Sequence, residues 1–394
     1  MAVEGNERLL DIDSVIASAE IASGTCGLVD DALRHRVSKL LEAFRARGAY
    51  TADQGIATRR QVVKLLARRL NIARDIGNHP AILDEEIIDP IFIIGFPRTG
   101  TSIQQALLGA DPANRPVRAW QVHEPSPPPG ERPVTAARKA AADAVVRHFL
   151  DRCPGIIALH PYWDMGAETL IEDEEILTLD FFDNYPVVLC DAPTLAIRVG
   201  EEDFEDAYRF LKLFLQHQQW RQPRKRWVLK GIEHQRHLST LFKVFPDARC
   251  LFPHREPAKF LPSNLTIAGV VYDGITCGGI DRQTLAAGYL ADFSGRLAAV
   301  MADPAMHDPR VRHMAFNRFI SDPVAALKQC YAEWGFDWTP EGEAAMRAWL
   351  DDPANDSDRY GRHTYTFAPF GVDWQTLGPT FDVYRQRYLS AGMS

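Results

Sequence analysis

The sequence predicts an α/β fold: a parallel sheet flanked by helices, with a helical region before it and helical insertions within it. The first observation is the run IFIIG at residues 91–95, which is almost wholly apolar and suits a strand buried on both faces. Similar short runs recur at 227–230, 248–254 and 311–316. Helix-like segments separate them, and strands that alternate with helices are typical of a parallel sheet covered on both sides.

The region before the first strand is expected to be helical. Within residues 61–76, apolar side chains recur at helical spacing with Arg and Lys between them, which predicts an amphipathic helix. His79-Pro80 interrupts this pattern. The sequence therefore predicts an N-terminal helical cap over residues 1–88 and an α/β domain over residues 89–394.

Further helices are expected between and after the strands. They cover 103–110, 203–221, 234–245, 257–268, 283–302 and 322–334. The proline-rich residues 125–133 predict a stiff, extended connector. A polar stretch after Pro353 predicts a surface loop, and a final helix is expected from about Trp374 to Leu389.

Length and composition describe an ordinary globular protein. The chain has 394 residues, of which 46% are hydrophobic and 24% charged, and its formal net charge is −8. These values argue against disorder, which needs low hydrophobicity and high net charge. The acidity also argues against a nucleic-acid partner, which would need a basic surface. A local basic pocket for a small anion remains compatible with it.

The cysteines and the N-terminus bear on the compartment. Cys26, Cys153, Cys190, Cys250, Cys277 and Cys330 lie far apart, and no CxxC pair or Cys/His cluster suggests zinc. Buried free thiols in a reduced, cytoplasmic setting are expected. The acidic start is unlike a signal peptide, and no stretch approaches the roughly 18 apolar residues of a spanning helix. We expect no integral membrane segment, although a lipid-like substrate stays possible.

A glycine loop, GFPRTGTS at residues 95–102, follows the first strand and opens a helix. Backbone amides at a helix N-terminus attract anions, and glycines let the backbone approach them closely. The two glycines have the spacing of the nucleotide loop GxxxxGK(S/T), but Thr101 stands in place of the lysine. Arg98 supplies positive charge within the loop instead. We expect a phosphate site that is not that of an ATPase or GTPase.

The segment IFIIGFPRTGTS resembles the 5′-phosphosulfate loop of sulfotransferases that use 3′-phosphoadenosine 5′-phosphosulfate (PAPS), in particular the bacterial group with a PRTGTT/S loop. The resemblance implies a P-loop-type α/β fold and transfer of a sulfuryl group to an acceptor hydroxyl or amine. It also implies which residues hold the phosphosulfate: Arg98, Thr99, Gly100, Thr101 and Ser102. Arg98 stands where many relatives carry Lys, and its planar fork can supply the same charge.

A second anion site is expected after the strand at 248–254. Arg255 ends this strand and Ser263 follows two helical turns later, so the two could hold a phosphate together. On residue type alone this signal is weak, because Arg at strand ends is common. The resemblance implies that Arg255 and Ser263 bind the 3′-phosphate of PAPS. It also implies nucleotide contact by Gly361 and Arg362, since DRYGRH resembles the family's closing KYGRH loop.

Transfer needs positive charge near the sulfuryl oxygens and a base for the acceptor's proton. Lys230 ends the strand WVLK and can reach the transferring group as a point charge. Its segment LKGIEHQRHL resembles the family's LKSPxHxxHL, with Gly231 and Ile232 in place of Ser and Pro. No DxD or HxH pattern demands a metal, and we expect none, because the leaving phosphate is already stable.

The base is harder to assign. The segment VRAWQVHEPSPPP resembles the family's RxWExxxPxPPP, but the family's Glu is Gln121 here, which cannot accept a proton at neutral pH. His123 or Glu124 could supply the function, and both could equally be ordinary polar residues of a loop. His160 is the next candidate. The acidic run at 168–175 matches a region beside the acceptor pocket, although a helix start explains such runs more often.

Aromatic residues could line an acceptor pocket, although such residues are more often core. They are Trp163, Phe181, Phe182 and Tyr185. We therefore expect a metal-independent sulfotransferase that acts on a small-molecule or lipid-like acceptor with PAPS as donor. The alternatives are a P-loop nucleotide phosphotransferase, which Thr101 disfavours, and a family member that binds nucleotide without transferase activity, which Gln121 suggests. Oligomeric state and acceptor identity are open.

Overall fold

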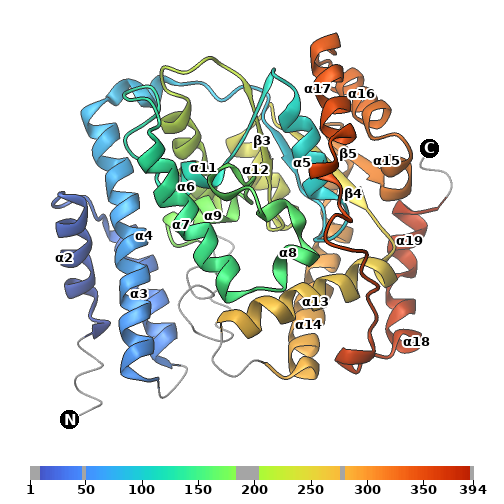
Figure 1. Ribbon diagram of the computed structural model, residues 1–394, viewed down its shortest axis with the longest axis horizontal. Helices are drawn as coiled ribbons and strands as arrows, with labels where there is room; N and C mark the ends of the chain where they lie inside the picture. The colour runs from blue at the N-terminus through green and yellow to red at the C-terminus, as the bar shows by residue number, and fades with distance from the viewer. Residues whose placement is uncertain (1–8, 47–49, 183–203, 276–279, 391–394) are drawn as a thin grey trace.

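The computed structural model describes residues 9–46, 50–182, 204–275 and 280–390. At its centre is a five-stranded parallel sheet of order β2-β3-β1-β4-β5 (Figure 1). The strands are β1 (Ile91–Ile93), β2 (Asn114–Pro116), β3 (Arg226–Lys230), β4 (Arg249–His254) and β5 (Val311–Ala315). The predicted parallel α/β fold is confirmed.

Strand β2 is the one that the sequence analysis missed. The other four strands lie where the apolar runs predict them. β2 consists of Asn, Arg and Pro, lies at one edge of the sheet and pairs with β3. Proline is tolerated in edge strands because its missing N–H need not face a neighbour. This strand is therefore defined by its pairing with β3 and not by an apolar run.

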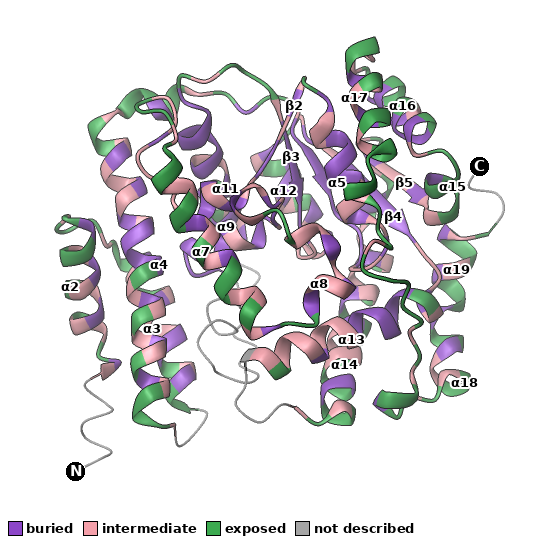
Figure 2. Ribbon diagram, in the orientation of Figure 1, coloured by how far each residue is buried: buried purple, intermediate pink, exposed green. Residues whose placement is uncertain are grey.

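The two faces of the sheet pack against different helices, because side chains alternate along a strand. The helices concerned are α4 (Ala52–Asn78), α5 (Thr101–Ala110), α11 (Phe204–Gln219), α12 (Leu238–Val244), α16 (Pro323–Trp334) and α17 (Pro340–Asp351). Phe92 and Leu229 share a buried cluster with residues of α4, α11 and α12. Ile93 and Val228 share another with α5, α16 and α17. Figure 2 shows the strands as the buried centre of these layers.

The other described α-helices flank this core. They are α2 (Ile12–Ser23), α3 (Asp31–Ala46), α6 (Ala119–His123), α7 (Ala136–Arg152), α8 (Ile156–Leu159), α9 (Glu174–Leu179), α13 (Pro257–Ile275), α14 (Arg282–Ala302), α15 (Phe316–Ser321), α18 (Trp374–Leu377) and α19 (Asp382–Tyr388). The helix predicted at 257–268 continues to Ile275. The prediction of a single final helix was wrong, because a 3₁₀ turn at Gly378–Phe381 separates α18 from α19. Pro379 in this turn has no N–H with which to continue the helical hydrogen bonds.

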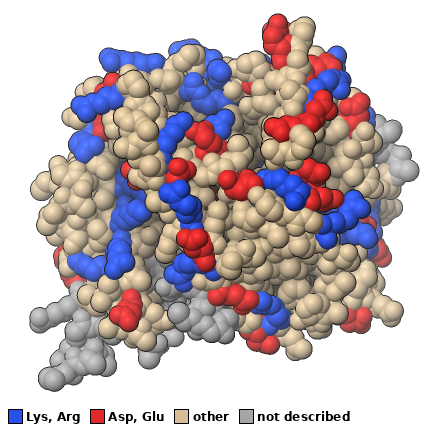
Figure 3. All heavy atoms as spheres, viewed as in Figure 1, with Lys and Arg blue, Asp and Glu red and all other residues tan. Residues whose placement is uncertain are grey.

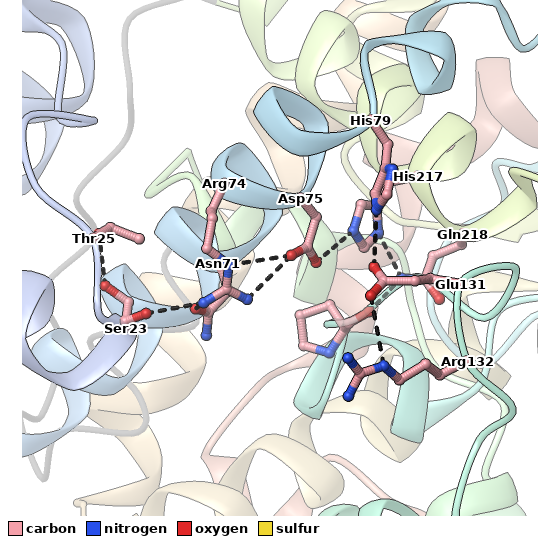
Figure 4. Close-up of polar contacts among 11 residues, drawn as sticks. Ser23, Thr25, Asn71, Arg74, Asp75, His79, Glu131, Arg132, His217 and Gln218 are labelled. Carbon is pink, nitrogen blue, oxygen red and sulfur yellow. Dashed lines mark hydrogen bonds and ion pairs between the residues drawn. The ribbon is translucent and has the colours of Figure 1, made fainter.

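Helix α4 contains the predicted amphipathic helix and ends just before His79-Pro80. It is joined to α11 by a buried polar contact, in which Asp75 Oδ2 lies 3.1 Å from His217 Nε2 (Figure 4). His79 Nε2 lies 3.2 Å from Glu131 Oε2 in the proline-rich connector. The N-terminal helices are thereby linked to a helix that covers the sheet.

Cys153, Cys250 and Cys330 are buried free thiols, and Cys26 is an exposed one. Cys190 and Cys277 lie outside the described residues. Of the helices within the described ranges, none combines the length and the apolar character that crossing a membrane requires.

Candidate functional site

The glycine loop connects β1 to the first turn of α5. Close packing requires its glycines: a Cβ on Gly95 would lie 2.5 Å from a proline of β4, and one on Gly100 would lie 2.9 Å from the Phe316 ring. Gly100 also has a φ of 95°, in the left-handed region that favours glycine. Because α5 begins at Thr101, the loop leads into the free amides of a helix N-terminus.

The structure brings Arg98, Arg255 and Ser263 together from distant parts of the chain. Arg98 Nε donates to Ser263 Oγ at 2.9 Å, and Arg255 Nη1 donates to the Arg98 carbonyl at 2.8 Å. The Arg255 guanidinium also lies 4.3 Å from the centre of the Phe316 ring. The two predicted anion sites are therefore adjacent, at the carboxyl ends of neighbouring strands β1 and β4.

In the part of the chain that the structure describes, no carboxylate neutralises the two guanidinium groups. Within the described ranges, neither Arg98 nor Arg255 forms an ion pair with a carboxylate. Burial lowers the pKa of Arg98, and burial together with the charge of Arg98 lowers the pKa of Arg255. Tyr365 lies close enough to Arg98 to oppose this lowering of its pKa, a proximity that no sequence motif indicated. Two close, partly desolvated cations make an anionic ligand favourable here.

The hydroxyl groups of the loop have different neighbours. Thr99 is fully buried and its Oγ1 donates to the Phe96 carbonyl at 2.6 Å, so it holds the loop closed. Ser102 Oγ lies 3.3 Å from Lys230 Nζ and 3.2 Å from His160 Nε2. Because the ammonium can only donate, the Ser102 hydroxyl accepts from Lys230 and keeps its own proton free for a further contact.

Lys230 ends β3 and pairs in register with Ile93 of β1, next to the glycine loop. Its side chain is buried, and Nζ lies 2.9 Å from Glu172 Oε1. Glu172 was not predicted as a site residue. A backbone bond of 2.9 Å from Asp173 N to the Lys230 carbonyl aligns the acidic run with the end of β3. The sequence gives no signal for this pairing, because the two segments are far apart in the chain.

The turn after β3 explains why glycine occupies position 231. A Cβ there would lie 2.3 Å from Asp173 Oδ1. Asp173 Oδ2 is 2.7 Å from His234 Nε2, and the Tyr208 hydroxyl is 2.9 Å from His234 Nδ1. Glu174 accepts hydrogen bonds from two backbone amides of the same turn. These buried carboxylates therefore shape the turn that positions Lys230, in addition to starting α9.

His123 and Glu124 end helix α6 and face a different set of neighbours. His123 Nε2 lies 3.7 Å from Glu175 Oε2, and Glu124 Oε1 lies 3.8 Å from Arg68 Nη2. Burial and nearby cations lower the pKa of His123 to about 3. Burial and the charge of Glu172 raise the pKa of Glu175 to about 8. Glu175 thus contacts His123 and is influenced by the carboxylate that pairs with Lys230.

Gln121 and His160 have structural contacts of their own. Gln121 Oε1 accepts from the Arg118 backbone N–H at 2.9 Å, so it caps α6. His160 is held beside Ser102, and burial together with two nearby cations lowers its pKa well below the usual value. The imidazole is therefore neutral here and a weaker base than an exposed histidine.

The predicted closing loop is anchored by Arg359. Arg359 Nη2 lies 2.9 Å from Asp164 Oδ2. Arg362 is 87% exposed and pairs with Asp358 at 3.2 Å, and Gly361 has a φ of 98°. The structure therefore holds the loop through Arg359 and directs the Arg362 side chain to solvent.

The C-terminal helix α19 braces the end of β4. The His254 ring stacks on the Tyr388 ring at 4.1 Å, and His254 Nδ1 lies 3.0 Å from the Tyr384 hydroxyl. His254 Nε2 lies 2.8 Å from His313 Nδ1 of β5. The backbone that carries Arg255 is therefore fixed from two sides.

Comparison with known proteins identifies the family. A family model described as "Sulfotransferase family" matches residues 90–340. The chain belongs to the sulfotransferase family. Among solved structures, it is similar to sulfotransferase STF9 from Mycobacterium avium, with a TM-score of 0.78, 25% identity, and coverage of 95% of this chain and 96% of the other. Sulfotransferase STF1 from Mycobacterium tuberculosis H37Rv shares the fold, with a TM-score of 0.72, 22% identity, and coverage of 95% and 98%. A search among curated protein sequences gives no match.

This sulfotransferase has a cavity of about 320 Å³ next to the residues just described. Trp163 lines it and packs against His160, with ring centroids 4.8 Å apart. Phe181 and Phe182 belong to the hydrophobic core, and Tyr185 lies outside the described residues. Of the aromatic residues considered for an acceptor pocket, Trp163 is therefore the one that the structure places at a cavity.

Proposed function

We propose that this sulfotransferase uses PAPS as donor and transfers a sulfuryl group to a hydroxyl or amine of a small-molecule or lipid-like acceptor, without a metal. The observation that carries the proposal is the pair of guanidinium groups, Arg98 and Arg255, which lie together beside a glycine loop and form no ion pair with a carboxylate of the described residues. A donor with a 5′-phosphosulfate and a 3′-phosphate would supply the missing negative charges.

The residues present fit such a donor. Arg98, with the loop residues Thr99, Gly100, Thr101 and Ser102, would hold the phosphosulfate at the start of α5, and Arg255 with Ser263 would hold the 3′-phosphate. Gly95 and Gly100 leave the room for a close approach that a Cβ would fill. Gly361 and Arg362 are proposed to contact the nucleotide when the loop closes. When bound, PAPS supplies the sulfuryl group, whose bond to the phosphate oxygen breaks as the acceptor oxygen or nitrogen bonds the sulfur.

Lys230 is proposed to neutralise charge on the transferring group, because it is the last residue of β3, next to the glycine loop, and carries a buried ammonium group. His123 and Glu124 stay candidates for the base, and Glu172 joins them on the strength of its 2.9 Å contact with Lys230. If Lys230 turns toward the sulfuryl oxygens, a Glu172 oxygen is released and can accept the acceptor's proton. His160 is the fourth candidate.

The deciding experiment is mass spectrometry of acceptor mixtures incubated with the enzyme and isotope-labelled PAPS. We expect labelled sulfuryl adducts of hydroxyl-bearing or amine-bearing acceptors, formed equally well with a metal chelator present. Magnesium-dependent ATP turnover with no response to PAPS would favour the phosphotransferase instead. Binding of adenosine 3′,5′-bisphosphate without any adduct would favour a family member that does not transfer.

A further inference from the structure

The cavity of about 320 Å³ has walls from α4, α6, α7 and α9, so part of it is built by the N-terminal helices. Its volume falls in the range of small-molecule sites. Most of its lining is apolar, including Leu65, Val122, Val146, Phe149, Ile171 and Leu179. An apolar lining of this kind suits the body of a hydrophobic ligand.

One wall of the cavity carries a buried cation that lacks a full set of partners. Arg68 of α4 is only 8% exposed, and within the described part of the chain its Nη2 has no hydrogen-bond partner. The nearest carboxylate oxygen, Glu124 Oε1, is 3.8 Å away, beyond hydrogen-bond range. Lys64, one turn earlier on α4, lines the same cavity. A buried guanidinium N–H without an acceptor is unfavourable, and a ligand oxygen would relieve this.

The remaining titratable groups around Arg68 leave this wall positive. Glu175 lines the cavity, and its pKa of about 8 keeps it mostly protonated at neutral pH. His123 is neutral there, whereas Arg68, with a pKa lowered by burial to about 10, stays charged. Among the described residues, the carboxylates whose charge acts on Arg68 are Glu124 and Glu175, and the second is mostly protonated at neutral pH. Figure 3 shows further Lys and Arg side chains gathered over α3 and α4 on this face of the molecule.

The lining also adjoins the transfer site. Trp163 packs on His160, which lies 3.2 Å from Ser102. Glu175 is close enough to Lys230 for the lysine charge to affect its pKa. The wall of the cavity formed by Trp163 and Glu175 is therefore next to the residues around Lys230, whereas Lys64 and Arg68 of α4 form another wall.

We propose that this cavity is the acceptor subsite and that it selects hydroxyl-bearing acceptors with an apolar body and an anionic group, such as a carboxylate, bound by Arg68 with help from Lys64. The proposal rests on the proposed function in that it takes the ligand to be the acceptor. It gives the N-terminal helices a role in selecting the substrate.

The test compares ω-hydroxydecanoate with its neutral methyl ester, using the full-length enzyme. Calorimetry with adenosine 3′,5′-bisphosphate present should show the acid binding at least tenfold more tightly than the ester. Arg68→Gln should remove this preference by weakening the acid alone, and Lys64→Gln should reduce it less. Arg60→Gln is the matched control, because Arg60 is an exposed residue of α4 outside the cavity lining.

Equal binding of acid and ester by the wild type would overturn the proposal, and so would equal losses for both in Arg68→Gln. Thermal melting checks that each variant is folded; should Arg68→Gln unfold, the wild-type preference and Lys64→Gln decide. The donor is measured separately. Loss of bisphosphate binding or of all transfer would count against the proposed function, whereas the charge preference in binding would still report on the cavity.

Discussion

The proposed donor side and the proposed acceptor side of this sulfotransferase, called below the donor side and the acceptor side, are built in different ways. The donor side uses strand ends: Arg98 follows β1, Arg255 follows β4, and a direct hydrogen bond of 2.8 Å joins them. The acceptor side uses helices, and its buried cation, Arg68, comes from α4, before the first strand. The sheet fixes the first arrangement through strand register, whereas the second depends on how the helices pack. Changes on one side should therefore leave the other side's binding intact.

The largest effect is expected where the two sides meet. Glu172→Gln should lower kcat about 10²–10⁴-fold if Glu172 is the base, with little change in donor or acceptor affinity. His123→Asn, Glu124→Gln and His160→Asn serve as matched comparisons in single-turnover assays. A larger loss in one of these three variants than in Glu172→Gln would move the base to that residue.

The second largest effect is expected on the affinity for the donor nucleotide. Arg98→Ala and Arg255→Ala should each weaken adenosine 3′,5′-bisphosphate by about 1.5–3 kcal/mol, the value of a charge-assisted hydrogen bond. Acceptor affinity should be unchanged in both. Calorimetry measures the loss, with Arg318→Ala as the control because Arg318 is exposed on α15. Unchanged affinity in both variants would contradict the donor assignment.

The residues that the sequence could predict lie at strand ends, and those that it could not predict are positioned by helix packing and long-range contacts. The glycine loop, Arg255 and Lys230 could be found because each follows an apolar run that marks a strand. Arg68 could not be found from the sequence, because a basic residue of an amphipathic helix usually belongs to the solvated face. Glu172 was hidden within an acidic run, which the backbone bond between Asp173 and Lys230 and the contacts of Asp173 and Glu174 hold at the end of β3. Residues positioned by long-range packing thus escape local patterns.

On the acceptor side, stability should depend on pH through Glu175. Its carboxyl group ionises near 4.5 in an unfolded chain but at about 8 in the fold. Stability is therefore full below pH 4.5 and falls as the pH rises toward 8. A pKa difference of one corresponds to about 1.4 kcal/mol. Glu175→Gln should remove this dependence. The free energy of unfolding of the variant, measured in denaturant melts, should therefore rise relative to that of the wild type from low to high pH. A difference that stays constant with pH would exclude the elevated pKa.

The smallest effect concerns two hydroxyls on the donor side. Ser263→Ala should cost about 1 kcal/mol of bisphosphate affinity, because it removes a direct partner of Arg98 and of the ligand. Thr99→Val should instead lower the free energy of unfolding by a similar amount, since Thr99 bonds the loop's own backbone. Calorimetry and denaturant melts together separate the two effects, and the reverse pattern would exchange the roles.

The brace formed by α19 has a consequence for how this enzyme is made. Tyr384 and Tyr388 fix the strand end that carries Arg255, yet they are among the last residues of the described chain to be synthesised. Proteins begin to fold from the N-terminus while translation continues. The helices that line the proposed acceptor cavity can therefore assemble on the ribosome, whereas the proposed donor site acquires its final geometry only after translation has passed Tyr388.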